Sequence, residues 1–141
     1  MTAQTLQGRV LVPGEAEGRV LALAAPISFW GGVDPATGRI ADPRHPDHGA
    51  EIAGRVLALP AAIGSSSSSA IMLELLRNGK APAALLLGAV DAILVLGVIV
   101  ARELGEPTIP VLALDPGDLA CLPRDGWIKV ERDGTVSARP R

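Results

Sequence analysis

The most informative stretch of this sequence is Ile63-Gly64-Ser65-Ser66-Ser67-Ser68-Ser69-Ala70. Five consecutive serines are typical of a flexible linker, but the flanking residues argue against that interpretation. In front of them, Gly54–Pro60 is a short apolar run typical of a buried strand. Behind them, Ile71–Gly79 has the pattern of a helix that ends at a glycine. The sequence therefore predicts a strand, a loop of small residues and a helix start.

Such a loop makes a natural site for an anion. The first backbone N–H groups of a helix have no partner within the helix, and the helix dipole favours negative charge there. The serine hydroxyls add further donors. Serine is also a preferred residue at helix N-caps, so a capped helix without a ligand is the alternative interpretation.

Composition limits the class of protein. The 141 residues are enough for one domain with a real core, and we expect a single domain over residues 1–141. Hydrophobic residues make up 48%, yet the aromatics are only Phe29, Trp30 and Trp127, so the core is aliphatic, as in mixed α/β layers. A net charge of −2 and the lack of interleaved basic and aromatic residues argue against a nucleic-acid partner.

Cys121 is the single cysteine, which excludes an intrachain disulfide and suits a reducing compartment. One thiol also excludes a self-contained iron–sulfur cluster or a Cys-type zinc site. We expect Cys121 to be a small buried apolar residue. The polar segment Met1–Gly8 has no apolar core of a signal peptide, so we expect a cytoplasmic protein.

One apolar segment, Ala83–Ala101, resembles a membrane span. A span needs about 20 apolar residues, and the central Asp91 would cost roughly 3 kcal/mol to insert. Gly88 and Asp91 also divide the segment where a turn is expected. The sequence therefore predicts a buried strand over Ala83–Leu87 and a buried helix over about Ala92–Leu104, with no membrane partner.

The remaining strands follow from a repeated tetrapeptide and from alternation. Gly-Arg-Val-Leu occurs three times and predicts core strands, the first two forming a hairpin-like pair around Pro13-Gly14. The central strand–helix–strand–helix–strand order implies parallel pairing with right-handed crossovers. The expected fold is α/β, a mixed sheet in β/β/α layers with a terminal β-hairpin. The strands concerned are Gly8–Leu11, Gly18–Leu21, Gly54–Leu57, Val111–Leu114, Trp127–Glu131 and Thr135–Ala138.

Two further loops are candidates for function. Phe29-Trp30 precede Gly31-Gly32, and a glycine pair allows a ligand or partner to approach the backbone closely; the alternative is an apolar plug over the core. The loop Asp42–Gly49 holds His45 and His48. Its prolines and the lack of a third strong ligand argue against a metal site, so we expect a surface loop that contacts substrate or a partner chain.

Common reaction motifs do not explain the serine loop. Gly64-Ser65-Ser66-Ser67 lacks the second glycine of a hydrolase nucleophile elbow, although His45, His48 and nearby aspartates supply the residue types of a triad. No Gly-Lys-Ser/Thr follows the strand, and the glycines do not form a dinucleotide fingerprint. From the residues alone, the loop is half of a site and needs a partner to become an enzyme.

An ordered set of motifs resembles the small subunit (swivelling domain) of aconitase X, over roughly Gly8–Leu114. The resemblance implies the swivelling β/β/α fold of the aconitase superfamily and a hydro-lyase reaction on a small hydroxy acid. It also implies a large subunit that carries the iron–sulfur cluster, with no cofactor or metal held by this chain. The motifs are Glu17-Gly18, Ile27–Asp34, Thr37-Gly38, Ala53–Leu57, Gly64-Ser65, Ser69 and Asn78-Gly79-x-Ala81-Pro82.

The resemblance also implies residue roles. Ser65 corresponds to the serine that takes the proton from carbon, and we expect substrate contacts from Gly64, Ser66, Ser67, Ser68, Ser69, Gly31 and Gly32. Family substrates are cis-3-hydroxy-L-proline and 5-phosphomevalonate. Trp30 and the loop of the two histidines favour the first. Pro60–Ile63 stands where some members have a lysine, which weakens the case for a phosphorylated substrate.

Two functions of other classes stay open. Swivelling domains also serve as anion-binding or phosphohistidine carriers, which would need a reactive histidine in an exposed glycine-rich loop. A lone serine hydrolase is the third possibility. His45 and His48 lie in a proline-rich loop away from the serines in sequence, which counts against the carrier.

Overall fold

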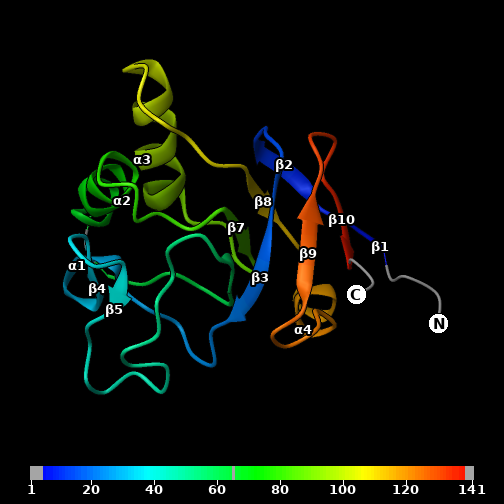
Figure 1. Cartoon of the computed structure of the whole chain (residues 1–141), viewed down its shortest axis with the longest axis horizontal. Helices are drawn as coiled ribbons and strands as arrows, with labels where there is room; N and C mark the ends of the chain where they lie inside the picture. The colour runs from blue at the N-terminus through cyan, green and yellow to red at the C-terminus, as the bar shows by residue number, and fades with distance from the viewer. Residues whose placement is uncertain (1–4, 65, 139–141) are drawn as a thin grey trace.

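The structure of the protein is a computed structural model that describes residues 5–64 and 66–138. Along the chain, strands and helices alternate in the middle, whereas the first and last strands pair antiparallel with their neighbours (Figure 1). The elements are β1 Thr5–Gln7, β2 Arg9–Val12, β3 Ala16–Ala22, α1 Phe29–Gly32, β4 Val33–Asp34, β5 Arg39–Ile40, β6 Val56–Leu59, α2 Ser68–Arg77, β7 Ala84–Leu87, α3 Ala92–Glu103, β8 Val111–Ala113, α4 Pro116–Ala120, β9 Trp127–Val130 and β10 Thr135–Ala138.

The main sheet has the strand order β1-β10-β9-β3-β6-β7-β8-β2. The strands β3, β6, β7 and β8 run parallel, as the central alternation of strands and helices predicts. The strands β1 and β2 form opposite edges of the sheet, yet only Gly8 separates them in the chain. The sheet must therefore curl until its two edges meet at Gly8, whose N–H donates to Gly134 O at 2.8 Å.

Alternation along the buried strands builds two cores. Successive side chains of a strand face opposite sides of a sheet, so an entirely apolar strand serves both. In β6, Leu57 and Leu59 pack under the helices, whereas Val56 and Ala58 pack inside the curled sheet. In β7, Leu85 and Leu87 face the helices and Leu86 faces inward. This is the predicted layered arrangement of sheet, sheet and helices.

The helices α2 and α3 form the outer layer and cross at a glycine. A Cβ added to Gly97 would lie 2.6 Å from Ser69 O, so only glycine allows this approach of the two helices. The predicted division of the apolar segment into a strand and a helix is confirmed by β7 and α3. The helix is only partly buried, however, because Leu96 and Ile99 are exposed on its outer face. No helix within residues 5–64 and 66–138 is long and apolar enough to cross a membrane.

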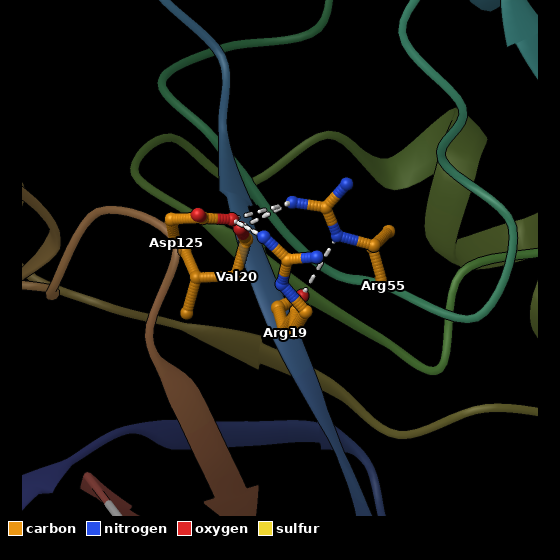
Figure 2. Close-up of polar contacts among 4 residues, drawn as sticks. All are labelled: Arg19, Val20, Arg55 and Asp125. Atoms are coloured by element: carbon orange, nitrogen blue, oxygen red, sulfur yellow. Dashed lines mark hydrogen bonds and ion pairs between the residues drawn. The ribbon is translucent and has the colours of Figure 1, made fainter.

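The terminal hairpin is confirmed, because β9 and β10 pair antiparallel. A polar cluster ties the turn before β9 to the parallel strands (Figure 2). Asp125, at φ 61°, pairs with Arg19 and lies 3.8 Å from the Arg55 guanidinium, which donates to Val20 O at 2.7 Å. The cluster is exposed, so its stabilising effect comes mainly from fixing this turn.

Two expectations are wrong. β2 and β3 do not form a hairpin, because β2 pairs with β8 and β3 lies between β6 and β9. The Pro13-Gly14 turn is a local signal, and pairing with distant buried strands overrides it. Cys121 is exposed rather than buried, since it follows the short surface helix α4.

Candidate functional site

The serine loop connects β6 to α2, as predicted. Ser67 occupies the N-cap position of α2 without a side-chain capping bond, and the Ser69 hydroxyl donates to Ser66 O at 2.9 Å. Gly64 has φ 100°, a conformation that favours glycine. Ser65, the predicted proton acceptor, lies outside the described residues. The loop therefore reaches α2 through a left-handed turn at Gly64.

The aromatic pair lies in α1, an irregular turn rather than a regular helix. Trp30 has ψ 117° and Gly31 has φ 79°, both outside the helical region. Phe29 is fully buried in the core under the helices, whereas the Trp30 side chain is 57% exposed. Phe29 therefore fills the core, as the alternative interpretation expected, whereas the Trp30 side chain is exposed to solvent next to Gly31.

These two segments meet in space. Ile63 N–H donates to Ile27 O at 3.0 Å, and Trp30 N–H donates to the Ser68 hydroxyl at 3.2 Å. The Ser28 hydroxyl donates to Trp30 O at 3.0 Å. The structure thus places α1 against the start of α2, as expected if Gly31 and the serine loop contribute to one site. Sequence reasoning missed Ser28, because no sequence signal separates it from other loop serines.

The predicted site residues differ in exposure. Gly31, Gly64, Ser66 and Ser67 are exposed, and Ser69 is half-buried. Ser68 is 4% exposed, and its hydroxyl already accepts from Trp30. Gly32 is also buried; a Cβ there would lie 3.0 Å from Ile27 Cγ1. Substrate binding by these residues stays a prediction, with the exposed ones open to solvent.

The electrostatics of the α2 start favour an anion. Its first turn carries no acidic residue, and its one basic residue at the far end is Arg77. The N–H groups of Ser69 and Ala70 donate to the carbonyls of Ser66 and Ser67, at 3.3 Å and 3.0 Å. With no carboxylate in the first turn, the helix dipole keeps its positive end at the start of α2. Among residues 5–64 and 66–138, no group of three His, Cys, Asp or Glu could hold a metal ion. Anion binding at this helix start stays a prediction, which the lack of acidic residues in the first turn favours.

The histidine loop is fastened to the segment after β3. His45 is 7% exposed; its Nε2 lies 3.1 Å from Ala25 O, and its Nδ1 accepts from Asp47 N–H at 3.0 Å. The Asp47 carboxylate accepts from Ala24 N–H at 2.9 Å. His45 therefore has a structural role inside this loop, and contact of the loop with substrate or a partner chain stays a prediction. His48 is exposed, and its contact with substrate or partner stays a prediction.

A carboxylate at the entry of that loop is held ionised. The backbone N–H of Arg44 donates to Asp42 at 2.9 Å, and this bond, aided by the charge of Arg44, lowers the pKa of Asp42 below its ordinary value. Asp42 is half-buried, and its bond to the Arg44 N–H shapes the turn at the entry of the loop.

Three comparisons with known proteins agree. The sequence model of the "Aconitase X swivel domain" matches residues 5–138. A cis-3-hydroxy-L-proline dehydratase of Pseudomonas aeruginosa is 41% identical over 98% of this chain, which spans only 25% of that relative. A phosphomevalonate dehydratase small subunit of Thermococcus onnurineus is 39% identical over 89% of this chain and 98% of its own length. Crystalline holo aconitase X of Thermococcus kodakaraensis superposes with a TM-score of 0.86, at 34% identity, over 97% of this chain and 99% of that chain.

Proposed function

The chain belongs to the aconitase X swivel domain family, and we propose that it is the small subunit of a heteromeric hydro-lyase. The reaction removes water from a small hydroxy acid. The main observation behind this proposal is the start of α2, which is lined by exposed serines and has no acidic residue in its first turn. It lies beside Trp30 and Gly31, and we interpret it as a site for an anion. The small subunit of Thermococcus onnurineus matches this chain over nearly its whole length, which supports the assignment to a small subunit.

A large subunit completes the site in this proposal. The Pseudomonas relative is about four times longer than the segment it shares with this chain, so there the matching region works beside other domains. An iron–sulfur cluster, which binds and activates the leaving hydroxyl in such a reaction, does not fit the residues described here. Cys121 is the single cysteine and is exposed, and no metal-binding group of three exists within residues 5–64 and 66–138. In this proposal, the large subunit would hold the cluster.

We assign proton removal to Ser65. Its alkoxide takes the proton from the carbon next to the substrate carboxylate; the C–H electron pair becomes the new double bond as hydroxide leaves the neighbouring carbon. Serine is a poor base unless its alkoxide is stabilised, and the N–H groups at the start of α2 supply part of that stabilisation. A cation from the large subunit supplies the rest. The serines Ser66 and Ser67, both exposed, bind the substrate carboxylate with Gly64.

The proposed substrate is cis-3-hydroxy-L-proline. Relatives in Pseudomonas aeruginosa and Hypocrea jecorina, both 41% identical, carry that activity in their names. The segment 60–69 contains no lysine or arginine, and a phosphate group favours a fixed cation. The alternative is 5-phosphomevalonate, which the archaeal small-subunit relatives favour by name.

The proposal is tested by producing the chain with its large subunit and measuring dehydration of both substrates. We expect turnover of cis-3-hydroxy-L-proline, none by the isolated chain, and a loss of about a thousandfold or more in kcat for Ser65→Ala. Ser137→Ala, in β10, is the matched control and keeps full activity. Full turnover by Ser65→Ala would refute the base, and turnover of 5-phosphomevalonate alone would reassign the substrate.

The structure weakens both other functions. A serine hydrolase needs a histidine that faces its serine, but the ring of His45 is buried and bonded to Ala25 and Asp47. The same burial removes His45 as a phosphate carrier. His48 is the remaining candidate, and phosphohistidine found there would revive the carrier function.

A further inference from the structure

The backbone of Trp30 is held on both sides by serine hydroxyls. Ser68, in the first turn of α2, accepts from Trp30 N–H at 3.2 Å, and Ser28 donates to Trp30 O at 3.0 Å. Ser68 is 4% exposed, so its bond is shielded from competing water. The Trp30 side chain is 57% exposed, so little packing holds the residue and the two hydroxyls fix its place.

Ser28, which bonds to Trp30 O, also contacts the serine loop at Gly64. A Cβ added to Gly64 would overlap the Ser28 hydroxyl and lie 2.8 Å from Ser28 Cβ, so the two residues are in direct contact. Ile63 N–H, one residue earlier, donates to Ile27 O at 3.0 Å. Ser28 therefore contacts the loop just before Ser65, and Ser68 anchors the turn just after it.

We propose that Ser28 and Ser68 are positioning residues, which clamp Trp30 and thereby fix the serine loop against Gly31 for the reaction. This inference rests on the proposed function. Neither hydroxyl is required to touch the substrate, because each acts through the backbone of Trp30. A loop that carries a reacting group must be held within a fraction of an ångström, since small misplacements reduce turnover sharply.

The kinetic test uses the complex with the large subunit. We expect Ser68→Ala and Ser28→Ala each to lower kcat about tenfold with a smaller change in KM, because positioning of the base is lost before binding of the anion. Ser68→Thr keeps a hydroxyl that can accept from Trp30 and restores kcat at least in part. Ser137→Ala in β10 controls for loss of a serine hydroxyl away from the site.

The structural test needs no activity. In the isolated full-length chain, amide hydrogen exchange at Trp30, measured by NMR, should accelerate about fivefold to tenfold in Ser68→Ala, because one hydrogen bond is lost. Exchange at Leu85, in the buried strand β7, reports whether the fold is intact. Ser68→Thr should return Trp30 toward the rate of the unmodified chain.

The outcomes separate the two proposals. Wild-type complex that dehydrates neither substrate overturns the proposed function and the positioning role with it, while Trp30 exchange still reports the clamp. Unchanged exchange in Ser68→Ala overturns the clamp. Faster exchange with unchanged kcat in an active complex shows that the clamp is structural alone and overturns the positioning role. Faster exchange with reduced kcat and rescue by Ser68→Thr supports it.

Discussion

The helices α2 and α3 both follow parallel strands of one sheet, yet their N-termini differ. At α3, the Asp91 carboxylate accepts from Ile93 N–H at 2.8 Å and from Leu94 N–H at 3.0 Å. At α2, Ser67 occupies the same position without a side-chain capping bond, and the first turn has no acidic residue. The start of α3 is thus capped by a carboxylate of the same chain, whereas the start of α2 is lined by neutral serine hydroxyls.

The difference between the two helix starts supports the place proposed for the ligand. A carboxylate at an N-cap satisfies the first N–H groups and neutralises the positive end of the helix dipole. The start of α3 has both effects built in, so it serves stability. The start of α2 has no carboxylate, and a left-handed turn at Gly64 leads the loop into it. In the proposed function, the anion that interacts with the positive end of α2 comes from the substrate.

The strongest test makes α2 resemble α3. We expect Ser67→Asp to lower kcat/KM of the complex by about a hundredfold or more, since a fixed carboxylate at the N-cap competes with the substrate carboxylate and repels it. The folded chain should be about as stable as the unmodified one, because Ser67 is exposed and a carboxylate near a helix start interacts favourably with the helix dipole. Steady-state kinetics and thermal unfolding measure the two effects.

Ser67→Asn is the matched control for this test. Asparagine has nearly the same size and shape as aspartate, but it brings no charge. If Asn and Asp reduce activity equally, the size of the side chain and not its charge is responsible, and the contrast between α2 and α3 loses its electrostatic basis.

The next largest effect concerns the approach to α2. Gly64→Ala should destabilise the folded chain by about 2–3 kcal/mol, because it adds a strained φ and a collision with Ser28. Gly54→Ala, at φ 70° with open space around its Cβ, has the strain without the collision and should cost about 1 kcal/mol. Urea unfolding distinguishes them, and Ser28→Gly should recover part of the loss in Gly64→Ala. Equal costs for the two alanines would show that Ser28 does not restrict the loop.

Much of this arrangement could be predicted from sequence because it is local. Buried apolar runs with helices between them fix β6, α2, β7 and α3, and alternation fixes the terminal hairpin. The clamp could not be predicted, since Trp30 and Ser68 are 38 residues apart and neither residue type is diagnostic. Pairing of β2 with β8 was missed for the same reason: its partner lies a hundred residues away, whereas the misleading Pro13-Gly14 turn is adjacent.

A smaller effect is expected from removing the cap of α3. Asp91→Ala should cost about 1 kcal/mol of unfolding free energy, because two first-turn N–H groups lose their acceptor. Ser67→Ala should cost less, since the backbone of Ser67 is in the right-handed helical region, where alanine is favourable and N-cap geometry is not adopted. Chemical denaturation of the two variants gives the comparison directly. A larger loss for Ser67→Ala would mean that the α2 start depends on its serine for stability, not for a ligand.

The smallest effect is direct binding of a simple anion to the isolated chain. Malonate, a dicarboxylate, should shift the amide NMR signals of Ser66–Ser69 and leave those of Ile93 and Leu94 unchanged, because the Asp91 carboxylate already occupies the second helix start. Half of the site is absent without the large subunit, so the affinity should be weak, on the order of millimolar. Sodium chloride at equal ionic strength controls for screening, and Ser67→Asp should abolish the shifts. Equal shifts at both helix starts would show that exposure of N–H groups, and not the missing carboxylate, governs anion binding in this fold.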